Sequence, residues 1–462
     1  MRKIVDLLLI LGTASLIYFK RITEETGTAV TSESIGYRSD FVFLLAVFLA
    51  IVVGIPRFLR YGKLVWTQTE AVVFGAIASY LIFCVIATLL SMVMYNLRFN
   101  LIGFSNVGKS FLMATLCLVT YIRLKDNPKL YRWLALACFI PPVVPLVFGV
   151  VYLVSPATYL SFFEDQSTVG VQLSLMSAGD RFQGLTSNPF QMLTSSLVAI
   201  GFLLPMTIQR LFRRRVVAAA VGFSYIGGLI FVVFWTMTRT GLLVLLFALG
   251  FGCFMALYHL RKDLMRFVAT LVGVVLLAGL AWSFMPEDLV EAYVSRFYSR
   301  DVVFGKWEYY TGGRIDIWSY FGEVAVYHPQ GVGFNFEQKF WLDSSFQERL
   351  NPHSALLMVW MFGGLGGFVS VLVFMWGVLR SIRIGVKRYR TERGFLYYIG
   401  AVTGVIGIWI AWQGPIFWEF THAILLAMVL RGAPPMAGGP ARAGVSRAVS
   451  TADASSSGLA KA

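Results

Sequence analysis

The sequence predicts an all-α integral membrane protein that crosses the bilayer about twelve times. Its 462 residues are 57% hydrophobic and only 14% charged, and their mean hydropathy is +0.71. A soluble domain carries about 25% charged residues and cannot hide this much apolar surface. The same composition excludes a disordered chain. The four cysteines all lie inside apolar runs, which excludes a disulfide-rich fold.

The apolar runs are long enough to serve as membrane spans, each of which needs about 20 mainly apolar residues. The first run follows Met1-Arg2-Lys3, as in a signal peptide, but Asp6 interrupts it and no Ala-x-Ala site follows. We therefore expect a retained helix. The runs cover residues 4–19, 39–55, 71–94, 107–122, 133–154, 191–209, 217–236, 241–258, 267–285, 354–379, 395–412 and 416–430.

Lysine and arginine residues gather in alternate connections between these runs. With the N-terminus in the cytoplasm, the cytoplasmic segments hold most of the 39 Lys and Arg, and most of the 24 Asp and Glu lie on the outer side. Because cytoplasmic loops carry the excess of basic residues, both termini are predicted to be cytoplasmic. The net charge of +15 then reflects anchoring against anionic membrane lipids and predicts no nucleic-acid partner.

Two outer segments are long enough to hold chemistry, residues 155–190 and residues 286–353. In the larger one, apolar residues at helical spacing, such as Ile315, Trp318 and Phe321, predict amphipathic helices on the membrane surface. We expect the helical bundle to extend over residues 1–432 and to include both segments. The tail, residues 433–462, is rich in Ala, Gly, Pro and Ser and is predicted to be disordered in the cytoplasm.

Residues 103–110, Gly-Phe-Ser-Asn-Val-Gly-Lys-Ser, satisfy the P-loop pattern G-x-x-x-x-G-K-S. A functional P-loop follows a buried strand and opens a helix, so that backbone N–H groups surround the phosphates. Here a membrane span precedes the pattern, and the topology puts it on the outer face, where nucleotide is scarce. We interpret the match as fortuitous, with Lys109 placed near lipid phosphate.

Three arginines are predicted to lie on the outer side. Arg181 precedes a span, Arg239 occupies a very short turn between two spans, and Arg314 begins an expected helix. Any one of them could be a snorkelling or salt-bridged residue. Together, three guanidinium groups could hold a phosphate or pyrophosphate by bidentate hydrogen bonds. The helix N–H groups after Gly313 would add donors to the same anion.

The four histidines have different surroundings. His259 is expected in a cytoplasmic loop, and His422 in the core of the last span. His328 precedes a proline in His-Pro-Gln-Gly-Val-Gly, which predicts a structural turn. His353 begins the tenth run at its outer end. An imidazole at that position can act as a general base near neutral pH.

The order of these motifs resembles that of the O-antigen ligase/polymerase family of bacterial membrane glycosyltransferases. The likeness covers residues 175–370, and Ser354 stands where Asn is commoner in the family. The final motif is similar to the ligase signature of His, then Asn, Ser or Gln, nine residues and Gly-x-x-Gly. The matching residues are Arg181-Phe182-x-Gly184 with Asn188-Pro189, Thr238-Arg239-Thr240, Gly313-Arg314 with Trp318, His328-Pro329-x-Gly331-x-Gly333, and His353-Ser354 with Gly364 and Gly367.

This resemblance implies a GT-C-like fold with a large periplasmic loop between the ninth and tenth helices. It also implies glycosyl transfer on the periplasmic face of the bacterial inner membrane, without nucleotide sugar, ATP or a required metal. The implied donor is a glycan linked to undecaprenyl diphosphate, and the implied acceptor is lipid A–core or another lipid-linked glycan.

The residues in matching positions suit this chemistry. Arg239, Arg314 and Arg181 would bind the diphosphate and stabilise its developing charge. His353 would take the proton of the acceptor hydroxyl, and a single displacement would invert the anomeric centre. Retaining glycosidases use two close carboxylates, and no such pair is identifiable. Further candidates for the site are Lys109, His328 and Asp316.

Two other functions fit parts of the pattern. A polymerase of the same family would extend lipid-linked repeat units with the same donor and the same chemistry. A flippase or transporter for lipid-linked glycan would catalyse no covalent step. Transporters place polar groups near the bilayer midplane and contain inverted repeats, whereas the polar residues singled out here lie at the outer rim.

Overall fold

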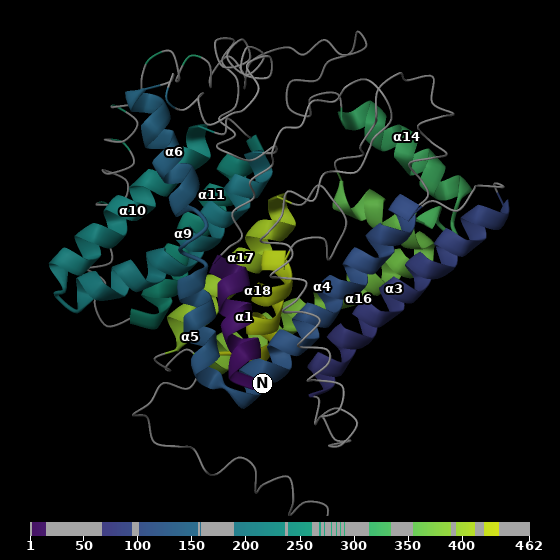
Figure 1. Cartoon of the computed structure of the whole chain (residues 1–462), viewed down its shortest axis with the longest axis horizontal. Coiled ribbons are helices and arrows are strands. Elements are labelled where there is room, and N and C mark those ends of the chain that lie inside the picture. Colours follow the sequence, from purple (N-terminus) through teal and green to yellow (C-terminus); the bar gives the residue numbers. More distant parts are fainter. Residues whose placement is uncertain are drawn as a thin grey trace, which may run out of the picture.

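A computed structural model describes most of the apolar runs and leaves much of the two outer segments undescribed. The described residues are 2–14, 67–94, 101–155, 158, 189–235, 239–260, 314–333, 354–389, 394–411 and 420–433, with single positions between 268 and 291. All regular structure in this part of the chain is helical, so the predicted all-α class is confirmed for it. Figure 1 shows these helices gathered into one bundle. The helices are α1 (Arg2–Ala14), α3 (Gln68–Met94), α4 (Leu101–Asp126), α5 (Pro128–Ala137), α6 (Val143–Val154), α9 (Pro189–Phe212), α10 (Val216–Trp235), α11 (Arg239–Leu260), α14 (Arg314–Tyr327), α16 (Ala355–Tyr389), α17 (Phe395–Ala411) and α18 (Phe420–Arg431).

Five helices within the described ranges are long and apolar enough to cross a membrane, namely α3, α9, α10, α11 and α16. Helices α17 and α18 are apolar but shorter. The run at 39–55, most of the run at 267–285, most of both outer segments and the tail from residue 434 lie outside the described residues. A count of about twelve crossings therefore stays a prediction.

The predicted span at 133–154 is wrong as a single helix. Helix α5 ends at Ala137, and α6 begins at Val143 after the pair Pro141-Pro142. Proline has no backbone N–H to donate and disfavours the helical conformation in the residue before it. The apolar run continues through this point, but the helix cannot.

Contacts between distant helix ends define one end of the bundle, which we call the basic end. The Nε of Arg431, in the last turn of α18, donates to the backbone oxygen of Leu124 near the end of α4 at 3.2 Å. The ring of Tyr389, the last residue of α16, lies 5.8 Å from that of Tyr398 in the first turn of α17. Helices α4, α16 and α18 therefore end at the basic end, and α17 begins there.

Three further helices reach the basic end. The ring of His259, in the last turn of α11, stacks on that of Phe395, the first residue of α17, at 5.3 Å. The Nζ of Lys125 in α4 lies 3.4 Å from Oε2 of Glu70 in the first turn of α3. Helix α9 packs antiparallel to α17, because Gly400 lies against Phe202 whereas Gly404, one turn later, lies near Val198. Helices α9 and α11 thus end here, and α3 begins here.

Helix α1 is attached at the basic end by an ion pair with little solvent exposure. Arg123 donates from Nε and Nη2 to the two carboxylate oxygens of Asp6 at 2.8 and 2.9 Å. Asn127 Nδ2 donates to Oδ2 of the same carboxylate at 2.9 Å. Paired bidentate geometry offsets much of the cost of removing these charges from water. This pairing explains how an apolar helix accommodates Asp6.

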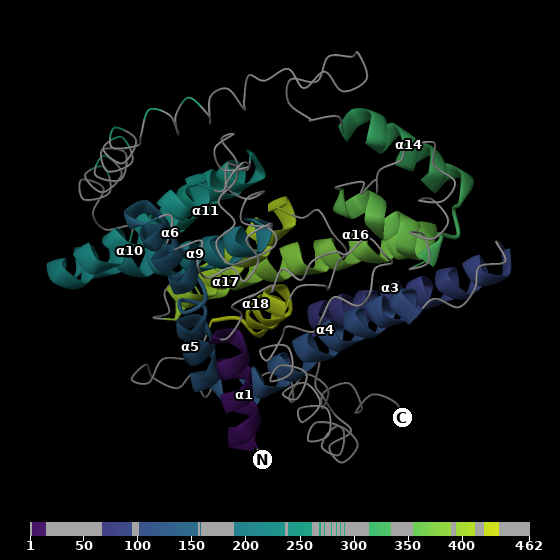
Figure 2. The same cartoon turned by 45° about the horizontal axis from the view of Figure 1, so that its top comes forward.

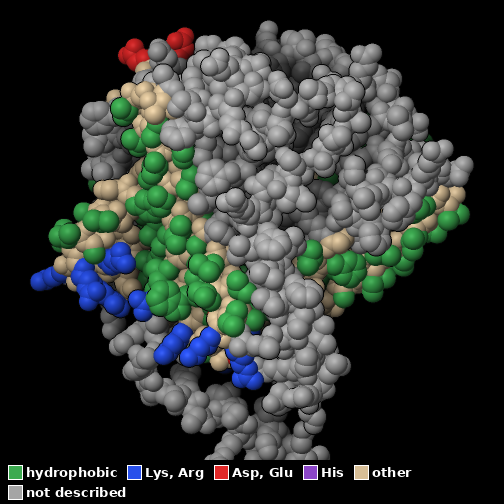
Figure 3. Space-filling view, viewed as in Figure 1, with side chains coloured by type: hydrophobic (Ala, Val, Ile, Leu, Met, Phe, Trp, Pro, Cys, Tyr) green, Lys and Arg blue, Asp and Glu red, His purple; other side chains and the backbone are tan. Residues whose placement is uncertain are grey.

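Surface charge differs between the two ends of the bundle. Figure 3 shows lysine and arginine side chains along the lower border, below a hydrophobic area, and acidic side chains at the upper border. This is the distribution that the positive-inside rule expects when the basic end faces the cytoplasm. The exposed basic residues on helix ends that meet there include Lys129, Arg132, Arg210, Arg213, Arg214, Arg215, Arg383, Lys387 and Arg388.

Candidate active site

Helix α11 places the backbone of Arg239 at the end of the bundle opposite the basic end. Arg239 is the first residue of α11, and His259 in its last turn lies at the basic end. At 1.5 Å per residue, a helix of this length extends over about 30 Å, which is close to the thickness of a bilayer core. The side chain of Arg239 lies outside the described part of the structure.

Helix α14 begins at Arg314 and lies against α16 at the same end of the bundle, as Figures 1 and 2 show. Its inner face buries Phe321, Val324 and Ala325, whereas Tyr327 is 78% exposed. The helix predicted from Ile315, Trp318 and Phe321 is confirmed. The side chains of Arg314 and Asp316, in its first turn, are not among those described.

Helix α16 contains a sharp bend at Gly364. This residue has φ +61° and ψ −163°, a backbone conformation that is essentially restricted to glycine. The rings of Trp360 and Phe368 lie 5.0 Å apart, although eight residues separate their positions by about 12 Å along a straight helix. Helix α16 therefore consists of a short segment, residues 355–363, and a long segment, residues 365–389.

A distant turn replaces the helical hydrogen bond that the bend breaks. In a continuous helix the backbone N–H of Leu365 would donate to the oxygen of Met361. Instead, Leu365 donates to the oxygen of Pro329 at 2.8 Å, and Met361 accepts from the N–H of Val332 at 2.7 Å. Both peptide groups that the bend releases are therefore satisfied by residues 329–332.

Glycines allow this turn to approach so closely. A Cβ on Gly331 would overlap the backbone of Gly364, and a Cβ on Gly364 would overlap Pro329 and Gln330. A Cβ on Gly333 would overlap the backbone of Thr88 in α3. We call residues 328–333 together with the bend at 361–365 the α14–α16 joint. It connects the end of α14 to the middle of α16 and leaves no room for side chains at these glycines.

The prediction of a structural turn at His328 is confirmed. Its N–H donates to the oxygen of Val324 at 3.0 Å, and its oxygen accepts from the N–H of Gly331 at 2.9 Å. The sequence reasoning recognised this turn but missed its partner, the bend at Gly364. The glycines of His-Pro-x-Gly-x-Gly and Gly-x-x-Gly were the available signal.

The remaining predicted residues are only partly covered by the structure. Residues 103–110 lie inside α4, where their backbone forms a helix and no phosphate-binding loop, which supports the reading of a fortuitous P-loop match. Lys109 is therefore part of α4, but its side chain is not described. Arg181 and His353 fall outside the described ranges, although Ser354, next to His353, is included and directly precedes α16.

Two other histidines are excluded from the candidate site by their contacts. His422 in α18 is 1% exposed and accepts a hydrogen bond from Trp409 Nε1 at 3.0 Å, which confirms its core role. The prediction that His259 lies in a loop is wrong, because the last turn of α11 includes it. Its ring contact with Phe395 orders this turn.

The charges at the start of α11 favour an anion there. A helix N-terminus carries partial positive charge and unpaired N–H groups, so a cation placed there costs about 0.3–1 kcal/mol. Helix α11 nevertheless begins with Arg239 and has no acidic residue in its first turn, whereas α14 has Asp316 two residues after Arg314. A bound phosphate or diphosphate would compensate this unfavourable placement.

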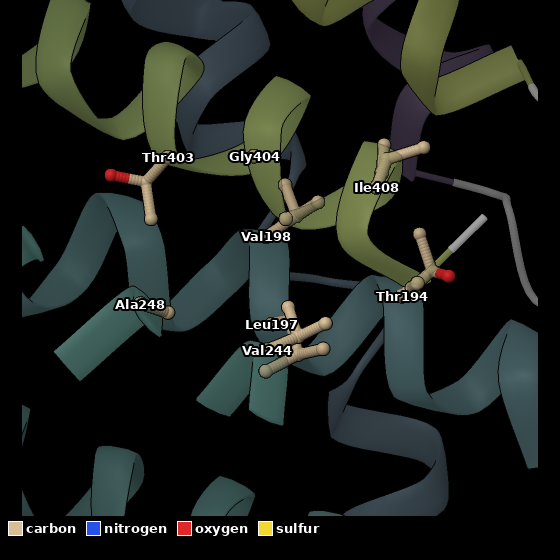
Figure 4. Close-up of a pocket in the computed structure, with 10 residues that line it drawn as sticks. Thr194, Leu197, Val198, Val244, Ala248, Thr403, Gly404 and Ile408 are labelled. Atoms are coloured by element: carbon tan, nitrogen blue, oxygen red, sulfur yellow. The ribbon is translucent and has the colours of Figure 1, made fainter. Parts of the chain in front are cut away.

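A crevice lies between α9, α11 and α17, as Figure 4 shows. The crevice is small, with room for about one water molecule. The residues that line it are Thr194, Leu197, Val198, Val244, Ala248, Thr403, Gly404, Gly407, Ile408 and Ala411. None of these side chains is charged or can act as a general base near neutral pH. The crevice is therefore not where we place the chemistry.

Comparison with known families tests the resemblance seen in the motifs. Residues 225–372 match the family model described as O-antigen ligase. The match includes Arg239, Arg314, His353 and both halves of the α14–α16 joint, whereas Arg181 and Lys109 lie outside it. A search of curated proteins gave no match. Residues 225–372 are therefore similar to the O-antigen ligase family, which supports the resemblance seen in the motifs.

Proposed function

We propose that this protein is an O-antigen ligase-like glycosyltransferase that moves a glycan from undecaprenyl diphosphate to an acceptor hydroxyl on the periplasmic face of the bacterial inner membrane. The observation that carries the proposal is the placement of helix starts. Helices α11 and α14 begin with Arg239 and Arg314, and the short segment of α16 begins just after His353, all away from the basic end. A basic end facing the cytoplasm leaves these starts on the periplasmic side.

In this mechanism the arginines bind the diphosphate of the donor. The bond between the anomeric carbon and the diphosphate oxygen breaks, and negative charge builds up on the leaving undecaprenyl diphosphate. Arg239 and Arg314 stabilise that charge together with the helix N–H groups behind them. Arg181, from the segment 155–190, supplies a third guanidinium, and Lys109 adds a weaker contact with phosphate.

His353 activates the acceptor. Its imidazole takes the proton of the acceptor hydroxyl while the oxygen forms the new bond to the anomeric carbon. The proton then passes to solvent, which regenerates the neutral base. Attack opposite the leaving group inverts the anomeric centre. One outer carboxylate, that of Asp180, Asp316 or Glu323, orients His353 or binds the sugar.

A deletion strain distinguishes the candidate functions. For a ligase, we expect long lipid-linked chains to accumulate on undecaprenyl diphosphate, while the acceptor remains unmodified on a gel. Accumulation of single repeat units on the periplasmic face would instead identify a polymerase. Repeat units retained on the cytoplasmic face would identify a flippase and contradict the proposal.

Transfer by the purified, reconstituted protein is expected to continue in EDTA and without ATP. The leaving diphosphate needs charge stabilisation, which guanidinium groups supply without a metal ion. The measurement is product formation from lipid-linked donor after chelation and desalting, with Lys109→Ala as a matched variant. Strict dependence on ATP that Lys109→Ala abolishes would restore the P-loop reading of residues 103–110.

A further inference from the structure

We propose that the α14–α16 joint is a positioning element, which holds the start of α14 and the start of the short α16 segment in a fixed relation. This inference rests on the proposed function, since it concerns the placement of Arg314 relative to His353. Gly331, Val332 and Gly364 are then positioning residues that touch neither donor nor acceptor.

The turn at residues 329–332 and the bend in α16 satisfy each other's backbone hydrogen bonds. The bonds from Val332 N–H to Met361 and from Leu365 N–H to Pro329, at 2.7 and 2.8 Å, replace one bond that a straight α16 would make within itself. If the bend remained without the turn, both peptide groups would be left unpaired, which is unfavourable inside the bundle. The bend and the turn therefore stabilise each other.

Packing on α3 fixes the joint to the bundle. Gly333 lies against the backbone of Thr88, and Gly363, next to the bend, lies near Cys84 and Tyr80. The joint is thus held between α3 and the long segment of α16, which pack extensively on each other. Helix α14 and the short segment both extend from this fixed point.

The core also holds α14 through Phe321 and the short segment through Val359, but each start lies at the far end of its segment from the joint. Arg314 lies at the opposite end of α14 from the joint, and Ala355 at the opposite end of the short segment. A small rotation at Gly331 or Gly364 therefore moves both starts. Displacement of a reacting group by about 1 Å can lower a rate by roughly 10²-fold.

Spin labels on the two segments test this proposal. Ser319 on α14 and Leu356 on the short segment are both exposed. The four native cysteines are buried, so labels would attach to the variants Ser319→Cys and Leu356→Cys. With the joint intact, we expect one narrow distance distribution between the labels, measured in reconstituted full-length protein.

Gly331→Ala should broaden or shift this distribution and lower kcat for transfer roughly 10²-fold, with a smaller change in the KM for donor. Because the overlap at Gly331 also destabilises the fold, kcat is normalised to the amount of folded protein in the membrane. Val332→Pro, which removes the N–H that bonds to Met361, should act in the same way and serves if Gly331→Ala does not accumulate. The matched control is Gly322→Ala on α14, where a Cβ would meet nothing within 4 Å.

An unchanged distance distribution in both joint variants would overturn the proposal, and so would a broadened distribution with normal kcat. The distance measurement needs no activity, which separates this proposal from the proposed function. Labels that respond in a protein unable to transfer glycan would refute glycosyl transfer while supporting the joint as the element that sets the two helix starts.

Discussion

Replacing His353 or Arg314 with alanine is expected to lower glycosyl transfer by a factor of at least about 10², because each change removes a group that acts in the transition state. Loss of the imidazole leaves the acceptor hydroxyl protonated during attack. Loss of the guanidinium leaves the charge on the departing diphosphate less stabilised. The measurement is transfer from lipid-linked donor by reconstituted protein, normalised to the amount of folded protein.

A histidine away from the proposed site provides the control for this experiment. His259→Ala removes a ring contact with Phe395 at the basic end, so transfer per folded molecule should stay near the unmodified value. Normal glycan in the His353→Ala strain would exclude His353 as the base. Normal glycan in the Arg314→Ala strain would exclude the proposed contact with diphosphate.

Replacing Arg123 with leucine is expected to lower the free energy of unfolding by about 3–5 kcal/mol, because the carboxylate of Asp6 would stay buried without its partner. The guanidinium makes two bonds to that carboxylate, at 2.8 and 2.9 Å. Both side chains are nearly buried, with exposed fractions of 10% and 12%. Unfolding in mixed detergent micelles, followed by circular dichroism, measures the effect.

Two variants test whether the loss of unfolding free energy comes from the buried Asp6–Arg123 pair. Changing both Asp6 and Arg123 to leucine should recover most of the stability, since apolar residues can replace a buried ion pair at little cost. Lys125→Ala removes a partly exposed contact with Glu70 and should cost less than about 1 kcal/mol. Similar losses for Arg123→Leu and Lys125→Ala would contradict an important role for the Asp6 pair.

Hydropathy predicted the straight helices of this protein well. The runs at 217–236 and 241–258 differ from α10 and α11 by at most two residues at each end. In these helices each turn satisfies its own peptide groups, so an apolar stretch of the right length is sufficient information. The burial of His422 was predicted on the same basis.

The breaks in the helices were harder to predict. Pro141-Pro142 interrupts the run at 133–154, and proline chemistry could have indicated this break. The bend at Gly364 lies in an equally apolar run, and nothing local distinguishes it from glycines inside straight helices. Its cause is a turn 33 residues earlier, at Gly331, and apolar periodicity carries no information about such a partner.

The sequence gives the candidate site residues by motif order, and the structure adds the backbone that carries some of them. It places the backbone of Arg239 and Arg314 at helix starts and includes Ser354, the residue that follows His353 in the sequence. Convergence of their side chains depends on the two outer segments, whose residues are far apart along the chain. It therefore stays a prediction.

During translation, Asp6 is added to the chain 117 residues earlier than its partner Arg123. During that interval the carboxylate has neither its guanidinium nor the amide of Asn127. The contacts that attach α1 to the bundle can therefore form only after translation has passed residue 127. Docking of α1 thus waits until more than 110 further residues have been synthesised.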